Sequence, residues 1–175
     1  SGTWFKISTD STGIYRIGYD DLVSMGIDPA AIDPRKIRIF GNGNGIIPEK
    51  NDEERLDDLV ENAIYVHGEE DGAFDPGDYI LFYGQSAIKW EFVPFQGYGL
   101  FVHSINPYTD HTYYFLNVDV AEGKRIATGM NQGLTPTVYV NAFTDYGVHE
   151  NDEVNILKTG REWYGEKFSE QTAYD

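Results

Sequence analysis

Short apolar segments separated by polar turn residues run along most of the chain. In Trp4–Ser8 and Ile14–Ile17 the apolar and polar side chains alternate, which is typical of strands with one buried face. The polar segment between them predicts a hairpin turn, with Gly13 at a position that needs a positive φ. Further predicted strands are Lys36–Phe40, Asn62–His67, Asp78–Tyr83, Lys89–Val93, Gly99–His103, Thr112–Val118 and Thr137–Val140. This spacing predicts an all-β fold, a β-sandwich with one or two short helices.

One segment has the signals of a short helix. Tyr19–Met25 carries two Asp residues in its first turn and apolar residues three apart, and Gly26 follows it. Asn51–Glu61 is crowded with charged side chains, so we expect a loop there, with a helical turn as the alternative.

The apolar alternation fades after residue 140, where charged residues become more frequent. We therefore predict a β-sandwich accessory domain over residues 1–140 and a connector or docking arm over residues 141–175, leading to a further domain. The arm carries Trp163, Tyr164 and Phe168 among its charges. Large aromatic side chains in a charged segment favour docking on a surface, so these three are the predicted domain-docking residues.

The charge of the chain argues against two classes of partner. It has 13 Lys and Arg against 29 Asp and Glu, a formal net charge of −16. Nucleic acids and anionic membrane surfaces are bound largely through basic side chains, so neither is an expected partner. We also expect no signal peptide and no membrane insertion, because the sequence shows no basic-then-apolar opening and no bilayer-length apolar run.

The absence of cysteine limits the chemistry of this chain. With no Cys, it has no disulfide, no thiolate metal ligand and no Cys nucleophile of its own. It also lacks a Gly-x-Ser-x-Gly motif. The four histidines, His67, His103, His111 and His149, do not have the close spacing of a zinc site. We therefore predict no catalytic residue in this chain.

Two loops have compositions that could hold a ligand. Gly41–Gly45 follows a predicted strand, as a phosphate loop does, but no helix signal follows it, so a glycine turn is favoured. Glu69–Asp78 is rich in carboxylates, and a Ca²⁺ site at Asp71, Asp75 and Asp78 is the alternative to a plain β-turn. No cofactor is predicted, with Ca²⁺ as the alternative. An acid–base role for Glu69 and Asp71 in a small independent enzyme is the least favoured hypothesis.

Aromatic residues crowd the segment from Trp90 to Phe101. Burial in the core or at a domain interface is the favoured interpretation, because large rings are seldom left exposed without a partner. The alternative is a carbohydrate-binding β-sandwich of a surface protein that stacks sugars on Trp90 or Trp163.

A series of segments, in this order, resembles the N-terminal region of a known peptidase family. The matching segments are Trp4–Ile7, Thr12–Tyr15, Asp33–Gly43, Glu61–Ile64, Gly68–Gly72, Phe74–Gln85, Tyr108–Asp110, Thr112–Leu116, Gly123–Ile126 and Gly160–Glu166. The family is that of the gingipain-like (C25) cysteine peptidases that serve type IX secretion, the PorU-type sortases or C-terminal signal peptidases. One departure is Lys158-Thr159-Gly160, where the family is expected to have Ser-Gly.

The resemblance implies a non-catalytic module of a longer, exported protein at the outer membrane or cell surface, with the periplasm as the alternative. The catalytic His and Cys would lie in a downstream peptidase domain, so no catalytic residue is carried over to this chain. The expected partners are that domain of the same polypeptide and components of the secretion system or cell surface.

Overall fold

The computed structural model describes residues 2–48, 50–127, 138–142, 147–150, 153–158 and 163–166. Contacts between Cα atoms divide the chain into two units, residues 1–129 and 130–175. Each unit is described by itself below. The domain boundary near residue 140 stays a prediction.

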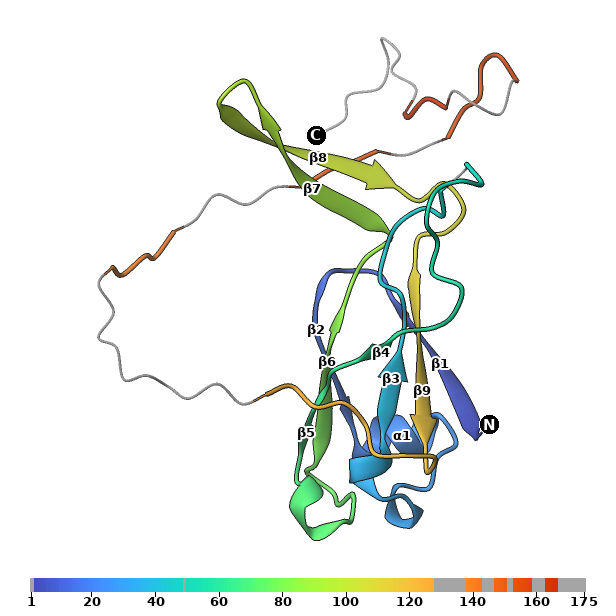
Figure 1. The fold of residues 1–175 in the computed structure, drawn as a ribbon, viewed down its shortest axis with the longest axis vertical. Helices are drawn as coiled ribbons and strands as arrows, with labels where there is room; N and C mark the ends of the chain where they lie inside the picture. The colour runs from blue at the N-terminus through green and yellow to red at the C-terminus, as the bar shows by residue number, and fades with distance from the viewer. Residues whose placement is uncertain are drawn as a thin grey trace. The chain divides into compact units, whose positions relative to one another are not determined.

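Two antiparallel sheets make up most of the first unit (Figure 1). The four-stranded sheet has the order β1 (Thr3–Thr9), β9 (Thr112–Val118), β3 (Arg38–Phe40) and β4 (Glu61–Asn62). The three-stranded sheet has the order β2 (Gly13–Gly18), β6 (Tyr79–Gly84) and β5 (Tyr65–His67). The predicted all-β sandwich is confirmed.

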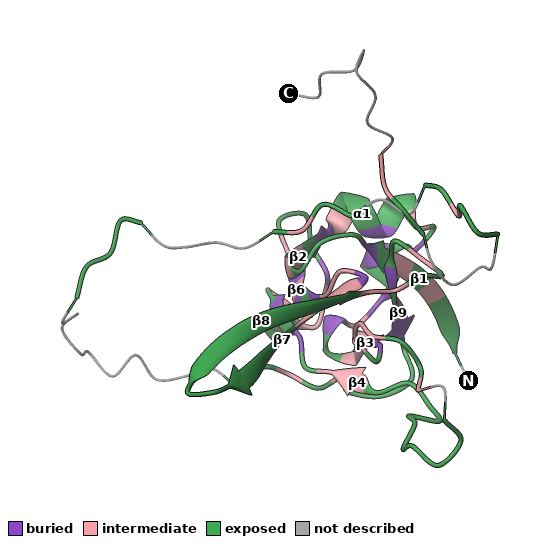
Figure 2. Cartoon of the chain, turned by 90° about the horizontal axis from the view of Figure 1, so that it is seen from above, coloured by how far each residue is buried: buried purple, intermediate pink, exposed green. Residues whose placement is uncertain are grey.

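The core lies where the inner faces of these sheets meet, as the buried residues in Figure 2 show. Leu116 and Ile39 from the larger sheet and Ile80 from the smaller one are fully buried. Phe82 of β6 meets Tyr114 of β9 edge to face, with 5.3 Å between ring centroids. The longer strands of both sheets contribute alternate residues to this layer, as the period of two in the sequence predicts, whereas β4 contributes none.

The helical segments are short. The predicted helix is confirmed as α1 (Tyr19–Ser24): the backbone N–H of Gly18 donates to Asp21 Oδ2 at 2.8 Å, and Gly26 follows the helix with φ +84°. Three 3₁₀ turns are η1 (Pro29–Ala31), η2 (Pro34–Lys36) and η3 (Glu69–Asp71). Residues 50–60 form turns and loop without a helix, as predicted.

The predicted opening hairpin is wrong. β1 pairs with β9 and β2 pairs with β6, so the two strands belong to different sheets. Gly13 begins β2 and is not among the residues with positive φ. The link between them crosses the sandwich and is held to the β6–β7 connection, because Thr9 Oγ1 donates to the carbonyl of Gln85 at 2.6 Å. Ile7 of β1 and Ile17 of β2 both pack on the core, but from opposite sheets, so the two strands face each other across it.

Two other predicted strands are broken. Asn62–His67 divides at Ile64 into β4 and β5, one in each sheet, and Ile64 itself is buried and bonded to the 124–126 segment. Lys36–Phe40 begins as the η2 turn, because Asp33 caps Pro34–Lys36, and only Arg38–Phe40 is extended. Residues 138–140 of the predicted strand Thr137–Val140 are not in a strand, and Thr137 lies outside the described residues.

The two strands predicted around Lys89–Val93 and Gly99–His103 are longer than expected. They form a hairpin of β7 (Ile88–Phe95) and β8 (Tyr98–Ile105), paired along their whole length. The connection is a two-residue turn at Gln96 and Gly97, with φ of +46° and +84°. Positive φ at both positions is the geometry that joins twisted strands most tightly.

Candidate functional site

The β7–β8 hairpin presents apolar side chains on both of its faces. One face carries Trp90 and Phe92 opposite His103 and Phe101, and the Phe92 and Phe101 rings meet edge to face at 5.3 Å. On the other face Val93 lies opposite Leu100 and Phe95 opposite Tyr98 near the turn. Phe92 is 60% exposed and Phe101 57%, and Figure 2 shows exposed residues over most of both strands. An isolated two-stranded hairpin is only marginally stable in water, and an exposed apolar surface of this kind marks a site of interaction with another domain or protein.

Trp90, which the alternative interpretation made a sugar platform, is half-buried on this hairpin. Its ring lies beside that of His103, with 5.1 Å between centroids. The His103 imidazole therefore already contacts the Trp90 indole on which a sugar ring would have to stack. The crowded aromatics of this segment are accordingly surface residues of a ribbon rather than part of the sandwich core.

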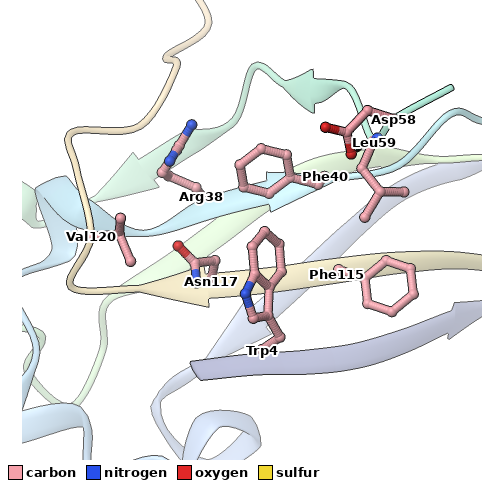
Figure 3. A pocket seen from close by; sticks show the side chains of 8 residues that line it. All are labelled: Trp4, Arg38, Phe40, Asp58, Leu59, Phe115, Asn117 and Val120. Carbon is pink, nitrogen blue, oxygen red and sulfur yellow. Dashed lines mark hydrogen bonds between the residues drawn. The ribbon is translucent and has the colours of Figure 1, made fainter. Parts of the chain in front are cut away.

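A second surface lies on the outer face of the larger sheet. It is an open groove of about 510 Å³, which we call the Trp4 groove, lined by Trp4, Arg38, Phe40, Asp58, Leu59, Phe115, Asn117 and Val120. Figure 3 shows the Trp4 indole extending from β1 across β9 toward the Phe40 ring on β3. Their centroids are 5.0 Å apart, and 43% of Trp4 is exposed.

Polar groups in the Trp4 groove are only partly paired. Arg38 and Asn117 are directly opposite each other on β3 and β9. Arg38 Nη2 donates to Glu61 Oε2 at 2.7 Å, and Asn117 Nδ2 donates to the carbonyl of Thr3 at 3.0 Å. Arg38 Nε and Asn117 Oδ1 are buried with no hydrogen-bond partner. Each such buried, unpaired group costs about 1–3 kcal/mol of folding free energy.

The ion pair beside the groove fixes the charge of Glu61. The hydrogen bond from Arg38 is the main cause that lowers the pKa of the Glu61 carboxyl, with a smaller contribution from the backbone N–H of Lys124. The Arg38 guanidinium also lies 4.6 Å from the Phe40 ring centroid. Arg38 is thus neutralised from one side and held against an aromatic ring.

The carboxylates of the loop considered as an alternative Ca²⁺ site serve the loop itself. Asp71 Oδ1 accepts from the backbone N–H of Ala73, and Asp78 Oδ2 accepts from that of Asp75. Glu69 accepts from Arg125 Nε at 2.8 Å, and Arg125 also donates to the carbonyls of Pro34 and Ile37. Among the residues the structure describes, no three His, Asp or Glu side chains are grouped so that they could hold a metal ion.

The glycine loop and the histidines that the sequence offered as candidates are each accounted for by local contacts. Gly43 and Gly45 adopt positive φ in a loop that no helix follows, as the favoured glycine turn requires. The histidines lie on separate segments: His67 stacks on Tyr79, His103 lies beside Trp90, His111 lies near Tyr113, and His149 contacts Glu166. Within the first unit, the structure does not group His67, His103 and His111 as a metal site would require.

The predicted docking residues belong to the second unit. Tyr164 and Val154 exchange backbone hydrogen bonds of 2.9 Å in both directions, which closes a small antiparallel bridge. Trp163 and Tyr164 are each 48% exposed beside it. Phe168 lies outside the described residues. Two of the three predicted side chains are therefore accessible aromatic residues on a short bridged segment.

The Trp4 groove was not predicted from the sequence. Trp4, Phe40 and Phe115 each occupy a strand position that alternates with the core-facing residues. This alternation was the sequence signal that could have placed them on the outer face of the sheet. These three side chains come together only because β9 lies between β1 and β3, and β9 is far from both of these strands in the sequence.

Comparison with solved structures shows a similarity over almost the whole chain. The crystal structure of dimeric latent PorU from Porphyromonas gingivalis matches 95% of this chain with a TM-score of 0.64 and 26% sequence identity. The match covers 14% of the PorU chain, so this chain spans a small part of that protein's length. No family model and no curated protein matches the chain. These findings support a PorU-related domain. No helix in the described part of the chain is long and apolar enough to cross a membrane.

Proposed function

We propose that this chain is a non-catalytic module of a PorU-like, gingipain-type cysteine peptidase that processes and anchors type IX secreted proteins at the cell surface. Its partners in this proposal are a downstream peptidase domain of the same polypeptide and components of the secretion system. The parent protein is exported, and its catalytic Cys and His lie outside this chain.

The observation that carries the proposal is the similarity to PorU. It extends over 95% of this chain at 26% identity, yet over only 14% of PorU, so the similarity is to one part of a much longer protein. The order of the matching segments in the sequence agrees with it. A module within a long chain needs a surface for its neighbours, and the exposed apolar hairpin supplies one.

The chemistry of the described residues fits a module better than an enzyme. The chain has no Cys. The acid–base pair considered from the sequence, Glu69 and Asp71, is engaged by Arg125 and by a backbone N–H. The exposed rings of the hairpin, by contrast, have the size and position of interface anchors, which are often aromatic.

The test of the docking role uses the full-length parent protein. We expect the double variant Phe92→Ser, Phe101→Ser to loosen the contact between this module and its neighbour. Both rings are more than half exposed in this chain, and the variant removes the area that they offer to the neighbour. Limited proteolysis between the domains and peptidase activity on a type IX substrate are the measurements. Tyr108→Ser is the matched control, because Tyr108 is an 86% exposed aromatic residue outside the hairpin.

The isolated chain supplies the complementary test. Incubated with fluorogenic peptides of mixed sequence, it should give no turnover, because it has no thiol nucleophile. Turnover that survives repeated purification and is abolished by a substitution in this chain would contradict the proposal. So would a parent protein with no caspase-like peptidase domain.

A further inference from the structure

We propose that the β7–β8 hairpin inserts into a cleft formed by the parent polypeptide outside this chain, with both of its faces buried there. The inference rests on the proposed function and adds how the module is held. The arrangement that it excludes is one-sided docking, in which the hairpin lies flat on a neighbouring domain and keeps one face in water.

Both faces of the hairpin are apolar near the turn. Val93, Phe95, Tyr98 and Leu100 lie on one face, and each of them is between 41% and 79% exposed. Phe92, which is 60% exposed, lies on the other face. A sheet that covers one surface keeps a polar face for water, whereas strands that are buried on both faces have continuous apolar runs. Burial on both sides therefore accounts for this pattern.

The charges of the hairpin lie at its root. Lys89 and Glu91 form an ion pair of 2.7 Å there, and both side chains are about half exposed. Residues 92–101, which include the turn, carry no charged side chain. Protein interfaces have this layout, with an uncharged centre and a polar rim. At about 3.3 Å per residue the uncharged part of each strand is roughly 13 Å long, which sets the depth of the cleft.

The hairpin is already formed in this chain. Its strands are paired along their whole length. At the root, Asn44 Nδ2 donates to the carbonyl of Ile88 at 3.0 Å, and the backbone N–H of Asn106 donates to the carbonyl of Ala87 at 3.3 Å. Because the backbone is ordered before docking, insertion costs little conformational entropy.

The length of the parent protein argues for an occupant in the same polypeptide. The similarity to PorU covers 95% of this chain but 14% of PorU, so most of a PorU-like parent lies outside this chain. Linkage within one polypeptide gives such a partner a high effective concentration. Two surfaces of the parent can therefore close on the hairpin without a separate binding event.

Charge argues against a lipid surface as the occupant. Segments that bind at membrane surfaces combine their apolar residues with Lys and Arg. Lys89 of the hairpin is paired with Glu91, and the chain carries a formal net charge of −16. An uncharged protein cleft meets no such mismatch.

The experiment compares thiol labelling in the full-length parent protein and in the isolated chain. This chain has no Cys, so mass spectrometry assigns an introduced Cys to a peptide of its own. Phe92→Cys reports on one face of the hairpin and Phe95→Cys on the other. We expect a maleimide to react with each of them about tenfold or more slowly in the parent than in the isolated chain, because a buried thiol reacts only after local opening.

One control and one independent measurement accompany the labelling. Tyr108→Cys is the matched control, because Tyr108 is 86% exposed and lies outside the hairpin. It should react at the same rate in both proteins. Hydroxyl-radical footprinting of the unsubstituted parent should show protection of Phe92 and Tyr98 alike, and it does not depend on how a variant folds.

Several outcomes would overturn the proposal. A rate ratio near one at either hairpin position would mean that this face is not buried in the parent. Protection that depends on the concentration of the parent would indicate a second copy as the occupant. Protection of the isolated chain by phosphatidylcholine vesicles would indicate a lipid surface. The proposed function fails on a different result, a parent without a caspase-like peptidase domain, because labelling does not depend on peptidase activity.

Discussion

β6 and β7 are consecutive strands with opposite surroundings. In β6 alternate residues are buried, and Phe82 is 1% exposed between Tyr15 and Tyr114. In β7 the residues from Glu91 to Phe95 are all exposed, although Phe92 and Phe95 are as apolar as Phe82. Aromatic content alone therefore does not decide burial. What decides it is whether a second sheet of the same chain faces the strand.

The largest test of this comparison replaces one ring in each strand. Phe82→Ala should lower the free energy of unfolding by about 3–5 kcal/mol, because it leaves a cavity between the sheets. Phe92→Ala in the isolated chain should change it by no more than about 0.5 kcal/mol, since its ring is 60% exposed. Urea denaturation measures both. Similar losses for the two variants would show that the hairpin ring is buried in the free chain.

A smaller effect is expected from a methyl group added to each region. A Cβ on Gly41 would lie 2.5 Å from Tyr114 Cδ1, a buried ring, so Gly41→Ala should cost about 1–3 kcal/mol. A Cβ on Gly99 would also meet a ring, that of Phe92, but this ring is exposed and can rotate away. Gly99→Ala should therefore leave the melting temperature almost unchanged. A large drop for Gly99→Ala would mean that the Phe92 ring is held in place.

Two ion pairs of equal length give the next comparison. Arg38–Glu61 in the sandwich and Lys89–Glu91 on the hairpin both measure 2.7 Å, but the hairpin pair is about half exposed. Glu61→Gln should cost about 1–2 kcal/mol at pH 7. Glu91→Gln should cost less than about 0.5 kcal/mol. Equal costs, measured by chemical denaturation, would contradict the difference in exposure.

The same pair predicts how stability depends on pH. The pKa of Glu61 is lowered in the folded chain by Arg38, so the stability it contributes is present above its unfolded value of 4.5 and is lost as the pH falls through the lower folded value. Unfolding measured from pH 6 to pH 3 should show a shallower acid loss in Glu61→Gln than in the unchanged chain. An identical slope would indicate that Glu61 is not held by Arg38.

The smallest predicted effect separates backbone conformation from packing. At both Gly13 and Gly97 a Cβ would project into open space, but only Gly97 has a positive φ, of +84°. Gly13→Ala should raise the free energy of unfolding by about 0.4–1 kcal/mol, because it restricts the unfolded chain. Gly97→Ala should instead destabilise the hairpin turn, which cross-strand NMR contacts between Phe95 and Tyr98 would report. A destabilised Gly13→Ala variant would contradict an extended, unstrained start of β2.

The sequence predicted what depends on local patterns. The alternation in Thr112–Val118 indicated the bounds of β9, and the two Asp residues before Leu22 indicated α1. Both follow from neighbouring residues. The fold class followed in the same way, because many short alternating segments have few architectures available to them.

What the sequence did not predict depends on partners distant in the chain. No residue near Gly13 indicates that β1 pairs with β9 rather than with β2. Likewise, no residue near Ile64 indicates that the two strands of this apolar segment belong to different sheets. The Trp4 groove needs the same information, because Arg38 and Asn117 are neighbours only through strand order. The sequence also did not predict that the hairpin is exposed, because its run of apolar residues is typical of a buried strand.

The pairing of β1 with β9 also bears on how the chain folds. Thr3 is paired with Val118, so the edge of the larger sheet can close only after more than a hundred residues have been made. At a synthesis rate of about 5–20 residues per second, β1 waits on the order of 10 s for its partner. During that interval its apolar inner face has no neighbour, which makes early chaperone contact and slow closure of a high-contact-order topology the expected course.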